Sequence, residues 1–165
     1  MKVDYHPVVH QILELIKSKG CWFEYFEHQS VRTSEEAAQV RTGYTLSQGA
    51  KALIIRVKRN QERQFVMLVV PGDQKFDKFK VREILESSDL RFATENEVSA
   101  ITQGVQLGGI PPFGNLFGLK VIADQALFNQ KVIIFNAGDK RFSVAIKSED
   151  FKKLVQPVVQ DICVR

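Results

Sequence analysis

The stretch Gly49-Ala50-Lys51-Ala52-Leu53-Ile54-Ile55 is the most apolar alternating run in the chain and predicts a central β-strand. Successive side chains of a strand point to opposite faces. The two faces predicted here hold Lys51, Leu53, Ile55 and Val57 on one side, and Ala52, Ile54 and Arg56 on the other. A lysine on an apolar face is partly desolvated, which favours a nearby anion or polarised oxygen as its partner. Alternatively, Lys51 is a strand-end lysine whose amine extends to water.

This strand is predicted to form one arm of a hairpin. Its arms are residues 51–58 and 64–70, which residues 59–63 join, and the turn Pro71-Gly72-Asp73 follows. Capping-box spacing at Thr33 and Glu36, and again at Thr94 and Glu97, marks two helix starts.

Further elements follow from periodicity and from the residues that favour turns. They are a helix from Pro7 to a stop at Gly20, a strand over 22–28, a short helix from Thr33 through Val40, helices over 77–85 and 94–101, strands over 119–123, 131–135 and 141–146, a turn over 136–140, and a last helix capped by Ser148. The fold class expected is α+β: one domain over residues 1–165, with a mixed, mainly antiparallel sheet flanked by helices.

Length and composition limit the class of protein. A chain of 165 residues with 44% hydrophobic residues is long enough for one core. No stretch approaches the roughly 18 apolar residues of a membrane helix, and the first seven residues do not resemble a signal peptide, so a cytoplasmic protein is expected. Cys21 and Cys163 lack CxxC spacing and are read as reduced thiols. His6 and His10 have the spacing of a metal pair without a third ligand, so a solvated helix face is preferred and no metal or cofactor is expected.

The second segment that could take part in a reaction is the loop Gly108-Gly109-Ile110-Pro111-Pro112-Phe113-Gly114. The two glycines allow close backbone approach and positive φ, Ile110 keeps a free N–H, and the prolines fix the backbone behind it. Such amides can hold an ester carbonyl oxygen as it becomes an oxyanion. A tight structural turn is the alternative.

Three polar residues are weaker candidates. His28 ends an aromatic strand before the segment 29–33, and it either lines a pocket mouth or is a half-buried structural histidine. Asp124 and Asn136 are both predicted at strand ends, where they either reach into a crevice or cap a turn. Basic residues at Lys75, Lys78, Lys80 and Arg82 permit a nucleic-acid partner but also fit a solvated surface.

Taken in order, these segments resemble the YbaK/ProX family, the free-standing relatives of the editing domain of bacterial prolyl-tRNA synthetases. The segments that carry the resemblance are His28 with Thr33-Ser34-Glu35-Glu36-Ala37-Ala38, Gly49-Ala50-Lys51-Ala52-Leu53, Val69-Val70-Pro71-Gly72-Asp73, Gly104 before the loop at 108–114, Asp124, and Phe135-Asn136-Ala137-Gly138. No single segment is diagnostic, but their order and spacing are.

The resemblance implies a metal-free hydrolase that cleaves the ester between a wrong amino acid and the 3′-terminal ribose of tRNA. Lys51 matches the family's essential lysine, which would hold a terminal phosphate or the carbonyl. Gly108 and Pro112 match the ends of its GxxxP loop, whose amides, including those of Gly109 and Ile110, would orient the carbonyl. His28, Pro111, Pro112, Asp124 and Asn136 would bind the substrate. The implied partners are aminoacyl-tRNA and, for delivery, a synthetase or elongation factor.

This sequence departs from the family pattern at three positions. Ala52 follows the lysine where many relatives have Thr, Ser or Asn. Asn136 stands in the region where the alanine-specific branch has a histidine, and Gln103 stands where a Thr often precedes the glycine. The amino acid removed is therefore not readable from the sequence. The rival hypothesis is a module that binds the aminoacyl end of tRNA without hydrolysing it.

Overall fold

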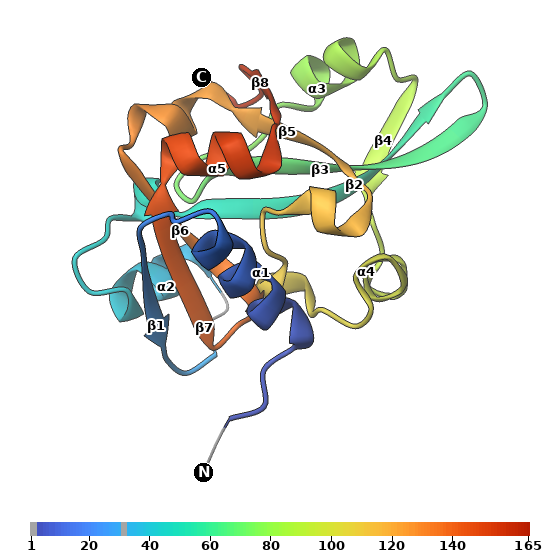
Figure 1. The fold of residues 1–165 in the computed structure, drawn as a ribbon. Coiled ribbons are helices and arrows are strands. Elements are labelled where there is room, and N and C mark those ends of the chain that lie inside the picture. The colour runs from blue at the N-terminus through green and yellow to red at the C-terminus, as the bar shows by residue number, and fades with distance from the viewer. Residues whose placement is uncertain (1–2, 31–32) are drawn as a thin grey trace.

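The computed structural model describes residues 3–30 and 33–165, so Met1, Lys2 and part of the segment 29–33 predicted near a pocket mouth, Val31 and Arg32, fall outside it. Its strands form two sheets (Figure 1). The three-stranded sheet is antiparallel, in the order β1 (Phe23–Glu27), β7 (Phe142–Lys147), β6 (Val132–Asp139). The five-stranded sheet has the order β4 (Asp89–Phe92), β2 (Ala50–Arg59), β3 (Glu62–Pro71), β5 (Lys120–Asp124), β8 (Val158–Gln160).

The fold class is confirmed as α+β with a mixed, mainly antiparallel arrangement of strands flanked by helices. Strand β3 pairs parallel with β5, and β5 pairs parallel with β8, whereas the other pairs are antiparallel. The difference from expectation is that the strands divide between two sheets. An isolated parallel bridge between Gly49 and Ile134 connects them.

The predicted hairpin of β2 and β3 is present and longer than expected. Asn60 and Gln61 both have positive φ, 50° and 66°, as a two-residue turn with the twist of the flanking strands requires. This tight turn lets Arg59 pair with Glu62, which the prediction had placed in the connection.

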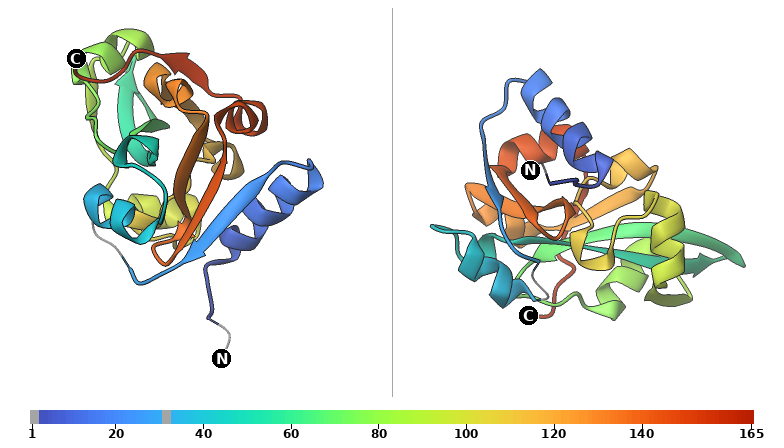
Figure 2. Two further views of the ribbon diagram at one scale, coloured as in Figure 1. Left: turned by 90° about the vertical axis from the view of Figure 1, so that its left-hand side faces the viewer. Right: turned by 90° about the horizontal axis from the view of Figure 1, so that it is seen from below.

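The two faces of β2 are both buried, as the alternation predicts. Ala52 and Ile54 belong to a core that also contains residues of α1, β6 and β7, whereas Ile55 and Val57 belong to a second core under α3. In the right-hand view of Figure 2, α1 and α3 accordingly lie on opposite sides of the five-stranded sheet.

The helices begin close to their predicted starts. They are α1 (Pro7–Ser18), α2 (Ser34–Val40), α3 (Lys78–Leu85), α4 (Glu95–Thr102) and α5 (Ser148–Val155). The side chains of Thr33 and Thr94 each accept a hydrogen bond from the amide three residues later, as N-caps do. The predicted Ser148 cap is wrong: Lys147 is the N-cap, and the Ser148 hydroxyl instead donates to the Gln130 carbonyl at 2.6 Å.

A second correction concerns residues 136–140, where a turn was predicted. Strand β6 continues to Asp139 through an irregularity between Asn136 and Asp139. Gly138, at φ 111°, allows this bulge, because a side chain there would be strained. Asn136 therefore lies inside a strand, paired with Ser143, rather than at a strand end.

Two strands were not predicted at all. Strand β4 is a short edge strand with alternating polar residues, and β8 has three residues. Both are too short for a periodic signal, and both form by pairing with distant strands. Within the described residues, no helix has the length and apolar character needed to cross a membrane.

Candidate functional site

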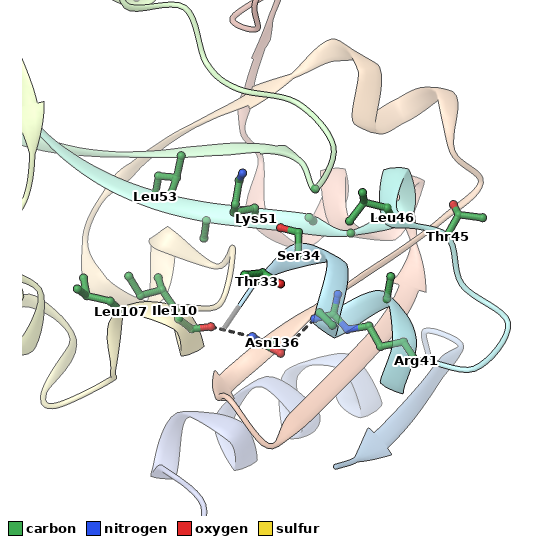
Figure 3. Close-up of a pocket in the computed structure, with 17 residues that line it drawn as sticks. Thr33, Ser34, Arg41, Thr45, Leu46, Lys51, Leu53, Leu107, Ile110 and Asn136 are labelled. Carbon is green, nitrogen blue, oxygen red and sulfur yellow. Dashed lines mark hydrogen bonds between the residues drawn. The ribbon is translucent and has the colours of Figure 1, made fainter. Parts of the chain in front are cut away.

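A cavity of about 280 Å³ lies where the two sheets meet (Figure 3). Its walls come from α2, the start of β2, the glycine-proline loop and β6. Lys51, Gly108, Ile110 and Asn136 all line it, so the structure brings together four of the residues singled out from the sequence. Ala52 also lines it.

Lys51 enters the cavity from β2. Its side chain is half-buried, and its Nζ donates to the Gln74 carbonyl oxygen at 3.4 Å, a long contact. Leu53, the next residue on the same face, lines the cavity as well. An ammonium group with one weak partner beside an apolar wall is well placed to attract an anionic or polarised oxygen.

The glycine-proline loop is anchored from behind by aromatic packing. Phe113 is fully buried, and its ring centroid lies 5.4 Å from that of Phe135 and 6.0 Å from that of Phe151. Pro111 and Pro112 are also buried and do not line the cavity. The prolines therefore fix the loop from the core side, while exposed Gly108 faces the cavity.

The glycines of this loop are needed for space rather than for unusual backbone angles. Neither Gly108 nor Gly109 has positive φ, so that part of the prediction is wrong. Close approach is present: a Cβ at Gly109 would lie 3.3 Å from the backbone of Asp139. Gly109 is buried there and is not part of the cavity wall.

The backbone polar groups of the loop are only partly used. The Gly109 amide donates to the Gln106 carbonyl at 2.9 Å, so it is not available to a ligand. The Gly108 carbonyl accepts from Asn136 Nδ2 at 2.7 Å. Within residues 3–30 and 33–165, the Gly108 amide makes no hydrogen bond, and the Ile110 amide makes none beyond the 3-10 turn over Leu107–Gly109. These two N–H groups are the donors that the loop offers.

Two residues that the sequence did not single out, Arg41 and Ser143, complete a polar chain behind the loop. Arg41 Nη2 donates to Asn136 Oδ1 at 3.1 Å, and Arg41 Nε donates to Ser143 Oγ at 3.0 Å. Figure 3 shows the Arg41 guanidinium extending toward Asn136 and the link from Asn136 to the loop. Because both ends of the Asn136 amide are engaged, its orientation is fixed.

The predicted residue His28 joins this chain but does not line the cavity. Its Nε2 lies 2.8 Å from Ser143 Oγ, and its Nδ1 donates to the Gln29 carbonyl at 2.7 Å. His28 therefore supports Ser143 from behind the cavity.

Burial has a strong effect on Arg41. The residue is 7% exposed, and desolvation lowers the pKa of its guanidinium to about 10. Ser143 has a recognisable sequence signal, since its hydroxyl interrupts an apolar run in β7 that ends only at Lys147. Arg41 has none, because it follows a short helix and meets its partners only through the fold.

Asp124 was predicted to bind the substrate, but its contacts in the structure are structural ones. It is fully buried, does not line the cavity, and accepts from the Ile162 amide at 2.9 Å and from Arg165 Nη2 at 3.0 Å. Burial alone would raise the pKa of its carboxyl, but these hydrogen bonds outweigh burial and lower it. Asp124 ties the C-terminal segment to the five-stranded sheet.

The other titratable candidates have local partners. His6 is the N-cap of α1, where its Nδ1 accepts from the Val8 amide at 3.1 Å. Both cysteines are free thiols, and burial raises the pKa of Cys163 to about 12. No three His, Cys, Asp or Glu side chains gather as a candidate metal site within the described ranges.

Comparison with known proteins places this geometry in a family. The model of the aminoacyl-tRNA editing domain matches residues 28–154, which include every residue of the cavity wall. The chain belongs to this family.

Individual members of the editing-domain family cover most of the chain. It is 35% identical over 152 residues to the multifunctional Ser/Thr-tRNA deacylase ProXp-y of Escherichia coli K12, with 91% of this chain and 90% of that protein covered. It is 25% identical over 138 residues to the prolyl-tRNA editing protein ProX of Acetoanaerobium sticklandii, with 81% and 82% covered. A solved structure described as a candidate trans-editing enzyme for prolyl tRNA synthetase shares the fold, with a TM-score of 0.82, 22% identity and coverage of 98% and 100%.

Proposed function

We propose that this chain is a free-standing aminoacyl-tRNA deacylase that hydrolyses the ester between a mischarged amino acid and the 3′-terminal ribose. The observation that carries the proposal is the meeting of Lys51 and Gly108, from distant segments, on the wall of one cavity. An ammonium group and free backbone amides together are the means of stabilising an oxyanion without a nucleophilic side chain.

In the proposed mechanism, water adds to the ester carbonyl carbon, and negative charge develops on the carbonyl oxygen. The amides of Gly108 and Ile110, with Lys51, stabilise that charge. The tetrahedral intermediate then collapses, the bond to the ribose oxygen breaks, and that oxygen takes up the proton given up by the attacking water, so that ester and water become the free amino acid and the ribose hydroxyl. Asn136 acts indirectly, because its hydrogen bond to the Gly108 carbonyl holds the loop in place.

We propose serine and threonine as the amino acids removed. The Escherichia coli relative, of which the alignment covers 90%, is named a Ser/Thr-tRNA deacylase. Small hydroxyl residues and aliphatic residues share the cavity wall, namely Ser34 and Thr45 with Ala37 and Ile110, which suits small hydroxyl side chains. A second site of this kind is needed because one methylene or hydroxyl group discriminates by only about 1–3 kcal/mol in a synthetase pocket.

The proposal also includes how the substrate is delivered, in which compartment the reaction takes place, and whether it needs a metal or cofactor. The chain would act as one editing domain, in trans and in the cytoplasm, on aminoacyl-tRNA delivered by a synthetase or an elongation factor. Catalysis would need no metal and no cofactor. Lys51, Gly108 and Ile110 would act on the reacting ester, and Asn136 would position the loop.

The decisive experiment is a single-turnover deacylation assay across tRNAs mischarged with serine, threonine, alanine and cysteine. We expect the fastest hydrolysis with the seryl and threonyl esters. Dialysis of the protein against a strong chelator is expected to leave those rates unchanged, whereas loss of activity that zinc restores would contradict a metal-free mechanism.

The same assay separates hydrolysis from the rival function. A module that only binds the aminoacyl end would protect the ester or leave its spontaneous hydrolysis unchanged. Tight binding with no acceleration for any ester in the panel would therefore replace the deacylase by a binding module.

A further inference from the structure

The charge of the cavity is unbalanced. Among the described residues, its charged lining residues are Arg41 and Lys51, and none of those that line it is an aspartate or glutamate. Neither cation has an ion pair among residues 3–30 and 33–165. Lys51 is half-buried and reaches water, but Arg41 is 7% exposed. Arg41 is thus a buried cation at the wall of a cavity without a carboxylate to compensate it.

The neighbours of Arg41 do not require a cation. Its two hydrogen bonds go to neutral groups, the Ser143 hydroxyl and the Asn136 side-chain oxygen. Ser143 Oγ also lies 2.8 Å from His28 Nε2 and 3.2 Å from Asn136 Oδ1, and its single proton can be donated to either of these neutral acceptors. A neutral donor could therefore satisfy this network, and burying a charge for it alone is unfavourable.

One edge of the guanidinium is unused. Arg41 Nη1 makes no hydrogen bond within the described part of the chain. It lies close to Gly49, where a Cβ would be 3.6 Å away, and Gly49 itself lines the cavity. Meanwhile Nε and Nη2 are held by Ser143 and Asn136, so the side chain is already ordered before a ligand arrives.

We propose that Arg41 is an oxyanion-binding residue of this cavity and that its Nη1 edge takes a negatively charged oxygen of the substrate or product. The proposal rests on the deacylase function, which supplies two such groups. One is the phosphate that precedes the terminal adenosine of tRNA, and the other is the carboxylate of the released amino acid. Both are oxyanions that a guanidinium binds with charge-assisted hydrogen bonds.

The test measures binding by isothermal titration with four small probes. Adenosine 5′-monophosphate is compared with adenosine, and L-serine is compared with serinol, so that each pair differs by the oxyanion. The variant is Arg41→Gln, which retains an amide donor but removes the charge. The matched control is Arg56→Gln, because Arg56 is a half-buried arginine on β2 that pairs with Asp89 and does not line the cavity.

For a phosphate ligand, Arg41→Gln should raise the Kd for adenosine 5′-monophosphate by about tenfold or more and leave the Kd for adenosine unchanged. For a carboxylate ligand, the same change should appear with L-serine and not with serinol. Arg56→Gln should bind all four probes as the unmodified protein does. Equal affinities of Arg41→Gln and the unmodified protein for both anionic probes would overturn the proposal.

A second measurement covers the case in which Arg41→Gln does not fold. In the unmodified protein, the NMR resonances of the Arg41 guanidinium should shift on titration with the anionic probe and not with its neutral counterpart. No shift with either anion would also overturn the proposal. Deacylation by the unmodified protein is measured separately, so a silent enzyme refutes the proposed function while a missing anion effect refutes only the role of Arg41.

Discussion

Lys51 is the residue whose proposed role can be tested most directly. Lys51→Ala should lower the single-turnover deacylation rate by about 10²–10⁴, the range for loss of one electrostatic or proton-transfer group. Lys51→Arg should also lose deacylation activity, because a planar guanidinium does not replace a compact ammonium group in a cavity of this size. Both variants should fold, since Nζ makes only one long hydrogen bond. An unchanged rate in Lys51→Ala would remove Lys51 from the mechanism.

Gly108 offers a second test, of the loop backbone. A Cβ at Gly108 would lie 2.8 Å from Lys140 Cε, the far part of a flexible side chain that can move. The φ of Gly108 is not positive, so Gly108→Ala should change the free energy of unfolding by only about 0.5 kcal/mol.

Gly108 nevertheless lines the cavity, so a shift of its backbone away from Lys140 should displace the substrate and slow the reaction by about tenfold or more. Thermal unfolding and single-turnover deacylation measured on one preparation of Gly108→Ala separate the two effects. If the variant were stable and fully active, the substrate would not approach this position.

At the level of residues, the sequence predicts the parts of the site that local chemistry marks. Lys51 stands out on an apolar strand, and the loop stands out by its glycines and prolines. Arg41 and Ser143 could not be predicted as its supports, because α2 and β7 bring them to Asn136 only through long-range packing. The structural role of Asp124 could not be predicted either, since its partner Arg165 is distant in the chain.

Among the secondary-structure elements, β6 has a bulge directly after Asn136, between that residue and Asp139. Gly138 allows it: its φ is 111°, and a Cβ there would lie 2.0 Å from Val8 Cγ1 on α1. Gly138→Ala should therefore overpack the contact between α1 and β6 and cost about 1–3 kcal/mol of stability beyond its backbone strain. Urea unfolding measures this cost.

Gly43→Ala is the matched control for this substitution. Gly43 also has positive φ, 89°, but no atom lies within 4 Å of a Cβ built there. It should lose only the backbone contribution, about 1 kcal/mol. Equal destabilisation of the two variants would show that packing against Val8 contributes nothing.

Elements with their own local signals were predictable, and elements that depend on partners were not. The helix starts at Thr33 and Thr94 follow from capping residues, and the β2 and β3 hairpin follows from alternation. Strands β4 and β8 are short, and they are ordered by pairing with β2 and β5. The division of the strands into two sheets likewise depends on long-range pairing. Alternation within one strand predicts its two faces but not which strands it pairs with.

For the molecule as a whole, Asp124 ties the C-terminal segment to the sheet, and its pKa makes that connection depend on pH. Because the folded state lowers this pKa, the carboxylate stabilises the fold above the ordinary aspartate value of about 4, and the contribution is lost as pH falls further. Asp124→Asn should lower the free energy of unfolding at pH 7 by about 1.5–3 kcal/mol and flatten its dependence on pH below about 4.

Deacylation by folded Asp124→Asn should be unchanged, since Asp124 lies outside the cavity wall. Denaturant unfolding between pH 2 and 7, alongside deacylation at pH 7, distinguishes this structural role from the substrate-binding role expected from the resemblance. A loss of rate in a fully folded variant would restore Asp124 to the substrate site.

The bridge between Gly49 and Ile134 has a consequence for how the molecule moves. It joins the two sheets beside the cavity, and the Gly49 carbonyl accepts the Gly72 amide at 2.9 Å. Gly49 and Gly72 both line the cavity, and their hydrogen bond extends the pairing of β2 with β3, so a ligand in the cavity would oppose local opening at this end of the hairpin. The amide proton of Gly72 should then exchange with solvent deuterium more slowly when the cavity is occupied, which makes this one proton a reporter of occupancy.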